Sequence, residues 1–258
     1  SPPESLVWEY RGRRVMEELL RHGRLPDVVG LQEVVGDFAE SLRACEPLTA
    51  LYDISPYDVG AYGVLLLTRR DLQVRFSVEQ LPTGMGRNVV LATFGAKAPG
   101  AVVASTHLES LENGPIRRAQ LQRIAATLRS PSAALFGDFN FDSRQNFGDW
   151  RREAHRKLPL ENMVLEEVMP DFADAWPAVR ADEGFTFDGA TNPINVHDPE
   201  ERMRYDRVMA RKDGFRVLAA ELLGTEAIND WDLRPSDHYG LQVDLELLQP
   251  VAATDLGE

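Results

Sequence analysis

Residues 133–140 read AALFGDFN, and this stretch decides the fold prediction. Its apolar run has the length of a buried strand and ends at Gly137. Two polar residues, Asp138 and Asn140, follow within three positions. Because catalytic groups in layered α/β proteins often lie on loops just past buried strands, we expect a site at this strand end.

The same pattern recurs on both sides of this stretch. Further strands are predicted from apolar or β-branched runs bounded by turn residues, at 27–34, 62–68, 73–79, 88–94, 101–107, 204–211, 215–222 and 239–247. Polar residues stand at or just beside the ends of several of them, namely Glu33, His107, Asp206, Asp237 and His238. Helical spacing predicts helices at 6–21 and 115–128, the second with Arg117, Arg118, Arg123 and Arg129 on its outside. The alternation of helices and strands predicts a layered α/β fold.

Composition limits the class of protein. The chain has 258 residues, of which 43% are apolar, and no apolar run is long enough to cross a bilayer, so one large domain without a membrane partner is expected. The single cysteine, Cys45, excludes an internal disulfide and fits a reducing compartment, although a secreted protein with one cysteine is also possible. The expected location is intracellular, nuclear or cytoplasmic. A net charge of −13 argues against a broad basic face for duplex nucleic acid. A bound cation would reverse that sign locally.

The residue types at the strand ends indicate their chemistry. Oxygen donors such as those of Glu33, Asp138 and Asn140 suit magnesium or manganese, which keep several waters. Zinc is not expected, because the chain has one cysteine and no closely spaced histidine pair. Neither a phosphate-binding P-loop nor a Gly-x-Ser-x-Gly elbow is present.

Five short motifs in order resemble those of the endonuclease/exonuclease/phosphatase superfamily: residues 31–34 (LQEV), 106–110 (THLES), 137–140 (GDFN), 204–207 (RYDR) and 236–238 (SDH). The resemblance implies a deoxyribonuclease I-like α/β fold, a four-layer sandwich of two mainly antiparallel β-sheets flanked by helices. It also implies a single domain over residues 1–258. Members of that superfamily carry an Asn on a first strand upstream of the first helix, and residues 1–258 begin after that point.

Within the superfamily, three segments are similar to 5′-tyrosyl-DNA phosphodiesterases: residues 85–88 (MGRN), 107–110 (HLES) and 236–241 (SDHYGL). Residues 185–188 (FTFD) with Asn192 resemble the substrate-side loop of that group, although Phe187 stands where the group usually has Trp. An aromatic platform for stacking would survive that change. The opening residues 6–11, with Trp8, look instead like the first helix of poly(A)-shortening nucleases of the superfamily.

The resemblance implies a role for each site residue. Glu33, with Asp237, would hold Mg²⁺ or Mn²⁺ at the scissile phosphate. Asp138 and Asn140 would orient and deprotonate the attacking water, while His238, fixed by Asp206, and His107 would bind the phosphate oxygens. The residues expected to contact substrate are Arg87, Asn88, Arg117, Phe187 and Asn192.

The expected function is therefore metal-dependent hydrolysis of a phosphodiester at a nucleic-acid end, with 5′-phosphotyrosyl DNA favoured and RNA an alternative. A 3′ exoribonuclease acting on poly(A) would use the same metal site. A small-molecule or lipid phosphoesterase is a further chemical alternative, and a catalytically silent binding module is the alternative from another class. The retained Glu33, Asp138, Asn140 and His238 argue against the silent module.

Overall fold

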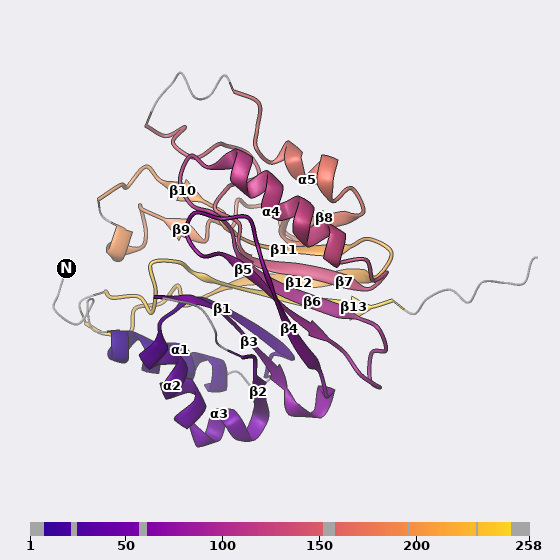
Figure 1. Ribbon diagram of the computed structural model, residues 1–258. Helices are drawn as coiled ribbons and strands as arrows, with labels where there is room; N and C mark the ends of the chain where they lie inside the picture. Colours follow the sequence, from indigo (N-terminus) through magenta and orange to yellow (C-terminus); the bar gives the residue numbers. More distant parts are fainter. Residues whose placement is uncertain are drawn as a thin grey trace, which may run out of the picture.

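A large mixed sheet forms the centre of the molecule (Figure 1). The computed structural model describes residues 8–21, 25–56, 61–151, 158–195, 197–230 and 232–248. The six strands of the large sheet follow the order β4 (Arg75–Gln80), β5 (Asn88–Thr93), β6 (Val102–His107), β7 (Ala133–Asp138), β11 (Asp206–Arg211) and β8 (Phe172–Asp174). Only β6 and β7 are parallel, and helix α4 (Gly114–Thr127) makes the crossover that this pairing requires.

A second β-layer covers one face of the large sheet. One part consists of β1 (Val28–Val34), β3 (Gly63–Arg69) and β2 (Tyr52–Ile54), with β3 in the middle. The other is the antiparallel pair β12 (Phe215–Leu223) and β13 (Gly240–Leu247). Strand β1 contacts β6 and β7, whereas β13 contacts β11. Phe215 and Leu245 pack into the same apolar cluster as residues of β3 and the large sheet, so both parts share the core between the layers.

Helices form the two outer layers (Figure 1). The helices on the side of β1 and β3 are α1 (Trp8–Arg21), α2 (Gly36–Ala44) and α3 (Glu46–Leu51). On the far side of the large sheet lie α4 and α5 (Met163–Val168). Shorter elements follow α5: α6 (Ala175–Val179), β9 (Phe187–Asp188), η4 (Pro193–Asn195) and β10 (Arg202–Met203).

Strand alternation in the sequence produces this layering. On β3, Leu65 and Leu67 face the helices while Val64 and Leu66 face the large sheet, and all four are at most 4% exposed. Successive side chains of a strand point to opposite faces, so a strand that is apolar at every position must be covered on both sides.

The predicted four-layer arrangement of two mainly antiparallel sheets flanked by helices is confirmed. Predicted and observed strands mostly differ by one or two residues at their ends. One expectation about helix α4 was wrong: Arg117 is 1% exposed and not on its outside. Residues 6 and 7, the start of the first predicted helix, and the side chain of Trp8 lie outside the described part of the structure.

Candidate active site

Four polar side chains lie in one row across the large sheet. His107 pairs with Asp138, and Asp138 pairs with Asp206. The register of β5 and β6 places Asn88 beside His107. Residues paired across neighbouring strands point to the same face, and Phe136, two positions before Asp138, packs into the core between the β-layers. The row therefore lies on the inner face of the large sheet, at the end of the sandwich.

The chain around Asp138 has a backbone shape that few residues tolerate. Gly137 has φ +129°, and a Cβ there would lie 2.0 Å from the carbonyl oxygen of Thr106. Asn140 is left-handed, with φ +56°, and its backbone N–H donates to Oδ1 of Asp138 at 2.8 Å. Its Nδ2 donates to the carbonyl of Leu108 at 3.0 Å. These contacts fix the carboxylate and the amide side by side.

His107 connects Asp138 to a buried arginine. Arg87 Nη1 lies 3.0 Å from Nδ1 of His107, and Nη2 donates to Ser110 Oγ at 2.9 Å. A guanidinium can only donate, so Nδ1 is the acceptor and the neutral ring carries its proton on Nε2. That nitrogen lies 3.3 Å from Oδ2 of Asp138. The Arg87 guanidinium also stacks over the ring of Tyr62, 5.3 Å from its centroid.

Burial shifts the pKa values of His107 and Asp138 in opposite directions. It lowers the pKa of His107, which the charge of Asp138 only partly offsets. It raises the pKa of Asp138, and the nearby Asp206 carboxylate raises it further although His107 opposes the shift. The pair therefore combines a neutral imidazole with a carboxylate that is more basic than an exposed one.

His238 and Asp206 form a second, charged pair. Nδ1 of His238 lies 2.7 Å from Oδ2 of Asp206, whose backbone N–H donates to Thr186 Oγ1 at 3.0 Å. Burial alone would lower the pKa of His238, but the Asp206 carboxylate, with smaller effects from Asp138 and Asp237, raises it to about 10. Burial would raise the pKa of Asp206, and His238 holds it below its ordinary value instead. At neutral pH the pair is an imidazolium and a carboxylate.

Aromatic rings pack around His238. Phe187 meets its ring edge-on, with centroids 5.3 Å apart and an interplanar angle of 75°. Tyr205 lies 6.1 Å from the His238 ring and 5.9 Å from Phe187. Phe187 and His238 also form an isolated backbone bridge. The aromatic residue expected on the substrate side therefore borders the charged pair directly.

Glu33 lies at an irregular end of β1. The pairing of β1 with β3 shifts between Leu31 and Val34, and Glu33 has φ +54° with its side chain exposed. A non-glycine residue in this conformation is strained. Gln32 Nε2 donates to Ser105 Oγ at 3.0 Å, which joins this end of β1 to β6 two residues before His107. The bulge thus leaves the Glu33 side chain exposed at the end of β1 that is joined to β6.

Asn192 supports the loop that carries Asp237 and His238. Its Nδ2 donates to the carbonyls of Ser236 and Asp237 at 2.9 and 3.1 Å, and the side chain of Asn195 donates to the same Asp237 carbonyl at 2.8 Å. Asn192 is 1% exposed. The structure therefore places it behind the site and not on the surface that substrate would meet.

Arg117 is likewise a buried support. Its guanidinium donates to both carboxylate oxygens of Glu161, at 2.6 and 2.7 Å, and to the carbonyls of Glu109 and Leu111, each at 2.7 Å. With these donors used and 1% of the residue exposed, it fixes the segment after β6. The expectation that Arg117 contacts substrate therefore does not fit its position.

A family model for the endonuclease/exonuclease/phosphatase family matches residues 6–238. The chain belongs to this family. The fold is that of hydrolases acting on phosphodiester bonds. A search of curated protein sequences found no match.

Solved structures agree with this fold. A TDP2 structure from D. rerio, complexed with a single-strand DNA product, superposes with a TM-score of 0.72 and 22% identity, covering 93% of this chain and 92% of that chain. A truncated TDP2 from Caenorhabditis elegans gives 0.68 with 25% identity, covering 93% and 90%. The human Nocturnin catalytic domain, with a bound sulfate anion, gives 0.65 with 19% identity, covering 93% and 87%.

The donors at the strand ends fit a hard cation in type. Within the described ranges, no three His, Cys, Asp or Glu side chains are grouped closely enough to hold a metal ion. Magnesium usually binds one or two carboxylates together with substrate phosphates and waters, so the absence of a three-ligand group among the described residues does not argue against a site at an exposed carboxylate such as that of Glu33. None of the described helices is long and apolar enough to cross a membrane.

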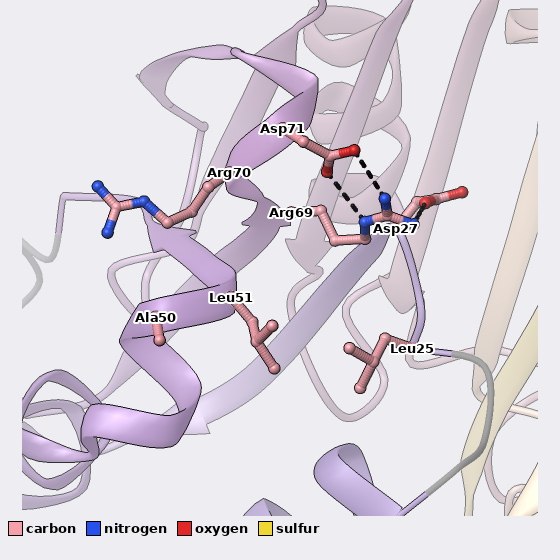
Figure 2. A pocket seen from close by; sticks show the side chains of 7 residues that line it. All are labelled: Leu25, Asp27, Ala50, Leu51, Arg69, Arg70 and Asp71. Atoms are coloured by element: carbon pink, nitrogen blue, oxygen red, sulfur yellow. Dashed lines mark hydrogen bonds and ion pairs between the residues drawn. The ribbon is translucent and has the colours of Figure 1, made fainter.

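A hollow at the other end of β1 is a poor candidate for a site (Figure 2). Its arginines are already paired: Arg69 with Asp71 and Asp27, at 2.7 and 3.1 Å, and Arg70 with Asp53 at 3.3 Å. The hollow is lined by Leu25, Asp27, Ala50, Leu51, Arg69, Arg70 and Asp71.

Sequence reasoning missed several residues that shape the site. Tyr62 stacks on Arg87, Thr186 holds Asp206, and Gln32 ties β1 to β6. Ser110 belongs to the 106–110 motif, and its contact with Arg87 could have been sought there. Thr186 and Gln32 likewise lie within the 185–188 and 31–34 segments, whereas Tyr62 belongs to no motif.

Proposed function

We propose that this chain is a divalent-metal-dependent phosphodiesterase that cleaves a phosphodiester at the end of a nucleic-acid strand, with 5′-phosphotyrosyl DNA as the leading substrate. The observation that carries the proposal is the row on the large sheet, in which a basic buried carboxylate, Asp138, stands between neutral His107 and the Asp206–His238 ion pair. An anionic, in-line displacement needs a base and a cationic donor held apart in this way.

Glu33 is the residue proposed to hold Mg²⁺, or Mn²⁺, with Asp237 as a second ligand directly or through water. When bound, the ion polarises phosphorus and offsets the charge that builds on a non-bridging oxygen. The strained backbone of Glu33 supports this role, because left-handed non-glycine residues cluster at functional sites.

Asp138 is proposed to take a proton from the attacking water. Its pKa is raised by burial, which makes it a better base than an exposed carboxylate. Asn140, held 2.8 Å from it through the backbone, would orient the same water. The Nε2–H of His107, directed at Asp138, keeps the carboxylate in place.

His238 is proposed to bind the phosphoryl oxygen. Its Nδ1–H donates to Asp206 at 2.7 Å, so Nε2–H is the donor left for substrate. Because the pKa of His238 is about 10, the ring enters the reaction already charged. A preorganised donor of this kind is worth roughly 3 kcal/mol in the transition state.

Arg87, Asn88 and Phe187 are the proposed substrate contacts. Arg87 would attract a phosphate at the edge of the row, and Phe187 would supply an aromatic surface for a base or a tyrosyl ring. The preference for a DNA end is supported by the likeness to a TDP2 that was crystallised with single-strand DNA product.

The test is a substrate panel with purified protein and Mg²⁺: a 5′-phosphotyrosyl oligodeoxynucleotide, its 5′-hydroxyl counterpart and a poly(A) oligoribonucleotide. Rapid release of tyrosine from the first alone is the expected result. Cleavage of poly(A) from its 3′ end would instead support a ribonuclease that uses the same site, for which the likeness to Nocturnin is the structural argument. Binding without any cleavage would support the silent module.

The single-domain organisation over residues 1–258 and a nuclear or cytoplasmic location stay predictions.

A further inference from the structure

We propose that Glu109 is a positioning residue that sets Arg87 for substrate through the hydroxyl of Thr83. The inference rests on the proposed function, in which Arg87 contacts the phosphate. It concerns the short loop between β4 and β5 that carries Arg87 to the row.

The Glu109 carboxylate is buried without a cation among its donors. It is 1% exposed and accepts from the Thr83 hydroxyl at 2.6 Å, the Gly84 backbone N–H at 2.8 Å and Gln120 Nε2 at 3.3 Å. Taking a carboxylate out of water is costly, and three neutral donors recover only part of that cost. A neutral Gln in the same place would cost less free energy to bury. We therefore infer that the Glu109 carboxylate is kept for a functional reason.

Thr83 transmits the position of Glu109 to the loop. Its Oγ1 accepts from the backbone N–H groups of Met85 and Arg87, at 2.9 and 3.1 Å. Since those amides can only donate, the hydroxyl proton of Thr83 is directed to Glu109. The carboxylate therefore fixes the hydroxyl, and the hydroxyl fixes the backbone of Arg87.

Gln120, on helix α4, contacts both the Glu109 backbone and the loop. Its Oε1 accepts from the backbone N–H of Glu109 at 2.9 Å, and its Nε2 donates to the carbonyl of Pro82 at 3.0 Å. Gln120 is fully buried. Gln120 thus holds Pro82, at the start of the loop, and the backbone of Glu109 against the same helix, without using the side chain of Arg87.

Arg87 is the point at which this loop meets the site. Its guanidinium reaches His107 at 3.0 Å and Ser110 at 2.9 Å. A small shift of the Arg87 backbone would move both contacts, and misplacement by about 1 Å can cost up to ~10²-fold in rate.

The test compares matched variants at Thr83 and Glu109. Thr83→Val keeps the shape and removes the hydroxyl, whereas Thr83→Ser keeps the hydroxyl. Thr127→Val is the control, because Thr127 donates to Glu79 at 2.8 Å in a pair of the same kind at the far end of α4. We expect kcat/KM to fall about tenfold in Thr83→Val and Glu109→Gln. Thr83→Ser should have a kcat/KM close to that of the wild type, and Thr127→Val should leave it unchanged.

A double mutant separates positioning from general loss of structure. If Thr83 acts through Arg87, Thr83→Val should add little to the loss already present in Arg87→Ala. A full additional tenfold loss in that background would overturn the inference, as would an unchanged kcat/KM in both Thr83→Val and Glu109→Gln.

A readout that needs no activity distinguishes this inference from the proposed function. Nδ1 of His107 accepts from Arg87, so its ¹⁵N chemical shift in histidine-labelled protein reports the position of the guanidinium. Thr83→Val and Glu109→Gln should move that shift, and Thr83→Ser and Thr127→Val should not. A shift that stays in place in Thr83→Val overturns the inference, whether or not the protein hydrolyses a phosphodiester. A moved shift in a protein that cleaves nothing supports the positioning and counts only against the proposed function.

Discussion

Glu33 holds a backbone conformation that its own side chain disfavours. A left-handed L-residue costs about 1 kcal/mol or more, and Glu33, at φ +54°, is exposed and gains no burial in return. Strain of this kind is retained where a side chain is needed in a particular direction.

Replacing Glu33 by glycine should therefore stabilise the fold while removing activity. We expect Glu33→Gly to raise the free energy of unfolding by roughly 0.5–1 kcal/mol and to abolish Mg²⁺-dependent cleavage. Urea unfolding and the phosphodiesterase assay measure the two effects. Gln73, at φ +51° beyond the 3₁₀ helix η2 (Arg70–Leu72), is the matched control, because Gln73→Gly should stabilise without loss of activity. A Glu33→Gly variant that is less stable than the wild type would contradict the strain argument.

In the proposed mechanism, Asp206 acts by keeping His238 positively charged. Asp206→Asn keeps the size of the side chain but removes the carboxylate that holds the imidazolium, 2.7 Å away. We expect kcat to fall by roughly 10², the loss typical of one preorganised donor. Asp213→Asn, in the exposed turn between β11 and β12, is the control and should leave kcat unchanged. Equal values of kcat for the wild type and Asp206→Asn would contradict the proposed role of charged His238 in binding the phosphoryl oxygen.

At the scale of elements, sequence prediction succeeded where a pattern is local. The strands at 88–94 and 101–107 agree closely with β5 and β6, because an apolar run of strand length with turn residues beyond it is a direct signal. The two- and three-residue strands β2, β8, β9 and β10 were not predicted, since such short segments have no period. Their pairing depends on the sheets that already exist around them.

Prediction of the candidate site also depended on whether the signal was local or came from distant parts of the chain. The structure brings together the predicted strand-end residues His107, Asp138 and Asp206, because neighbouring strands place them in register. Arg117 was misplaced because its partner, Glu161, is far away in the chain and helical spacing could not reveal it. Tyr62 is similarly visible only through its contact with Arg87.

The close approach of β1 to the large sheet depends on Gly30. A Cβ at this position would meet the ring of Phe136 at 2.4 Å and Ser105 Oγ at 2.6 Å. We expect Gly30→Ala to lower the free energy of unfolding by about 1–3 kcal/mol, the usual cost of overpacking. Thermal or urea unfolding measures it, and Phe136→Leu in the same chain should recover part of the loss. If the two substitutions are simply additive, the contact does not limit the separation of the layers.

At the scale of the whole molecule, buried ion pairs tie distant segments together. Asp174, at the end of β8, pairs with Arg204 and Arg207, at 2.8 and 2.6 Å, and all three are nearly inaccessible. Burial alone would raise the pKa of Asp174, but the two arginines outweigh it and hold the pKa below its ordinary value.

This pairing predicts how stability depends on pH. Because the folded-state pKa of Asp174 is lowered, its contribution is complete above the unfolded-state pKa of about 3.9 and is lost as pH falls through the folded value. Asp174→Asn should be less stable than the wild type by about 3 kcal/mol at pH 7, because it leaves two buried cations unpaired. Urea unfolding between pH 7 and pH 3 should show the gap narrowing only at the acid end. If the difference in free energy of unfolding between the two proteins is constant over this range, the charge of the Asp174 carboxylate does not stabilise the fold.

The central claim is that the row on the large sheet, together with a divalent cation, cleaves a phosphodiester. The most direct test is the single-turnover rate on a 5′-phosphotyrosyl oligodeoxynucleotide for the wild type and Asp138→Asn, each with Mg²⁺ and with chelator. We predict cleavage by the wild type that requires Mg²⁺ and falls by at least about 10² in Asp138→Asn, with the fold intact. Cleavage that persists in chelator, or that is equal in the two proteins, would contradict the account.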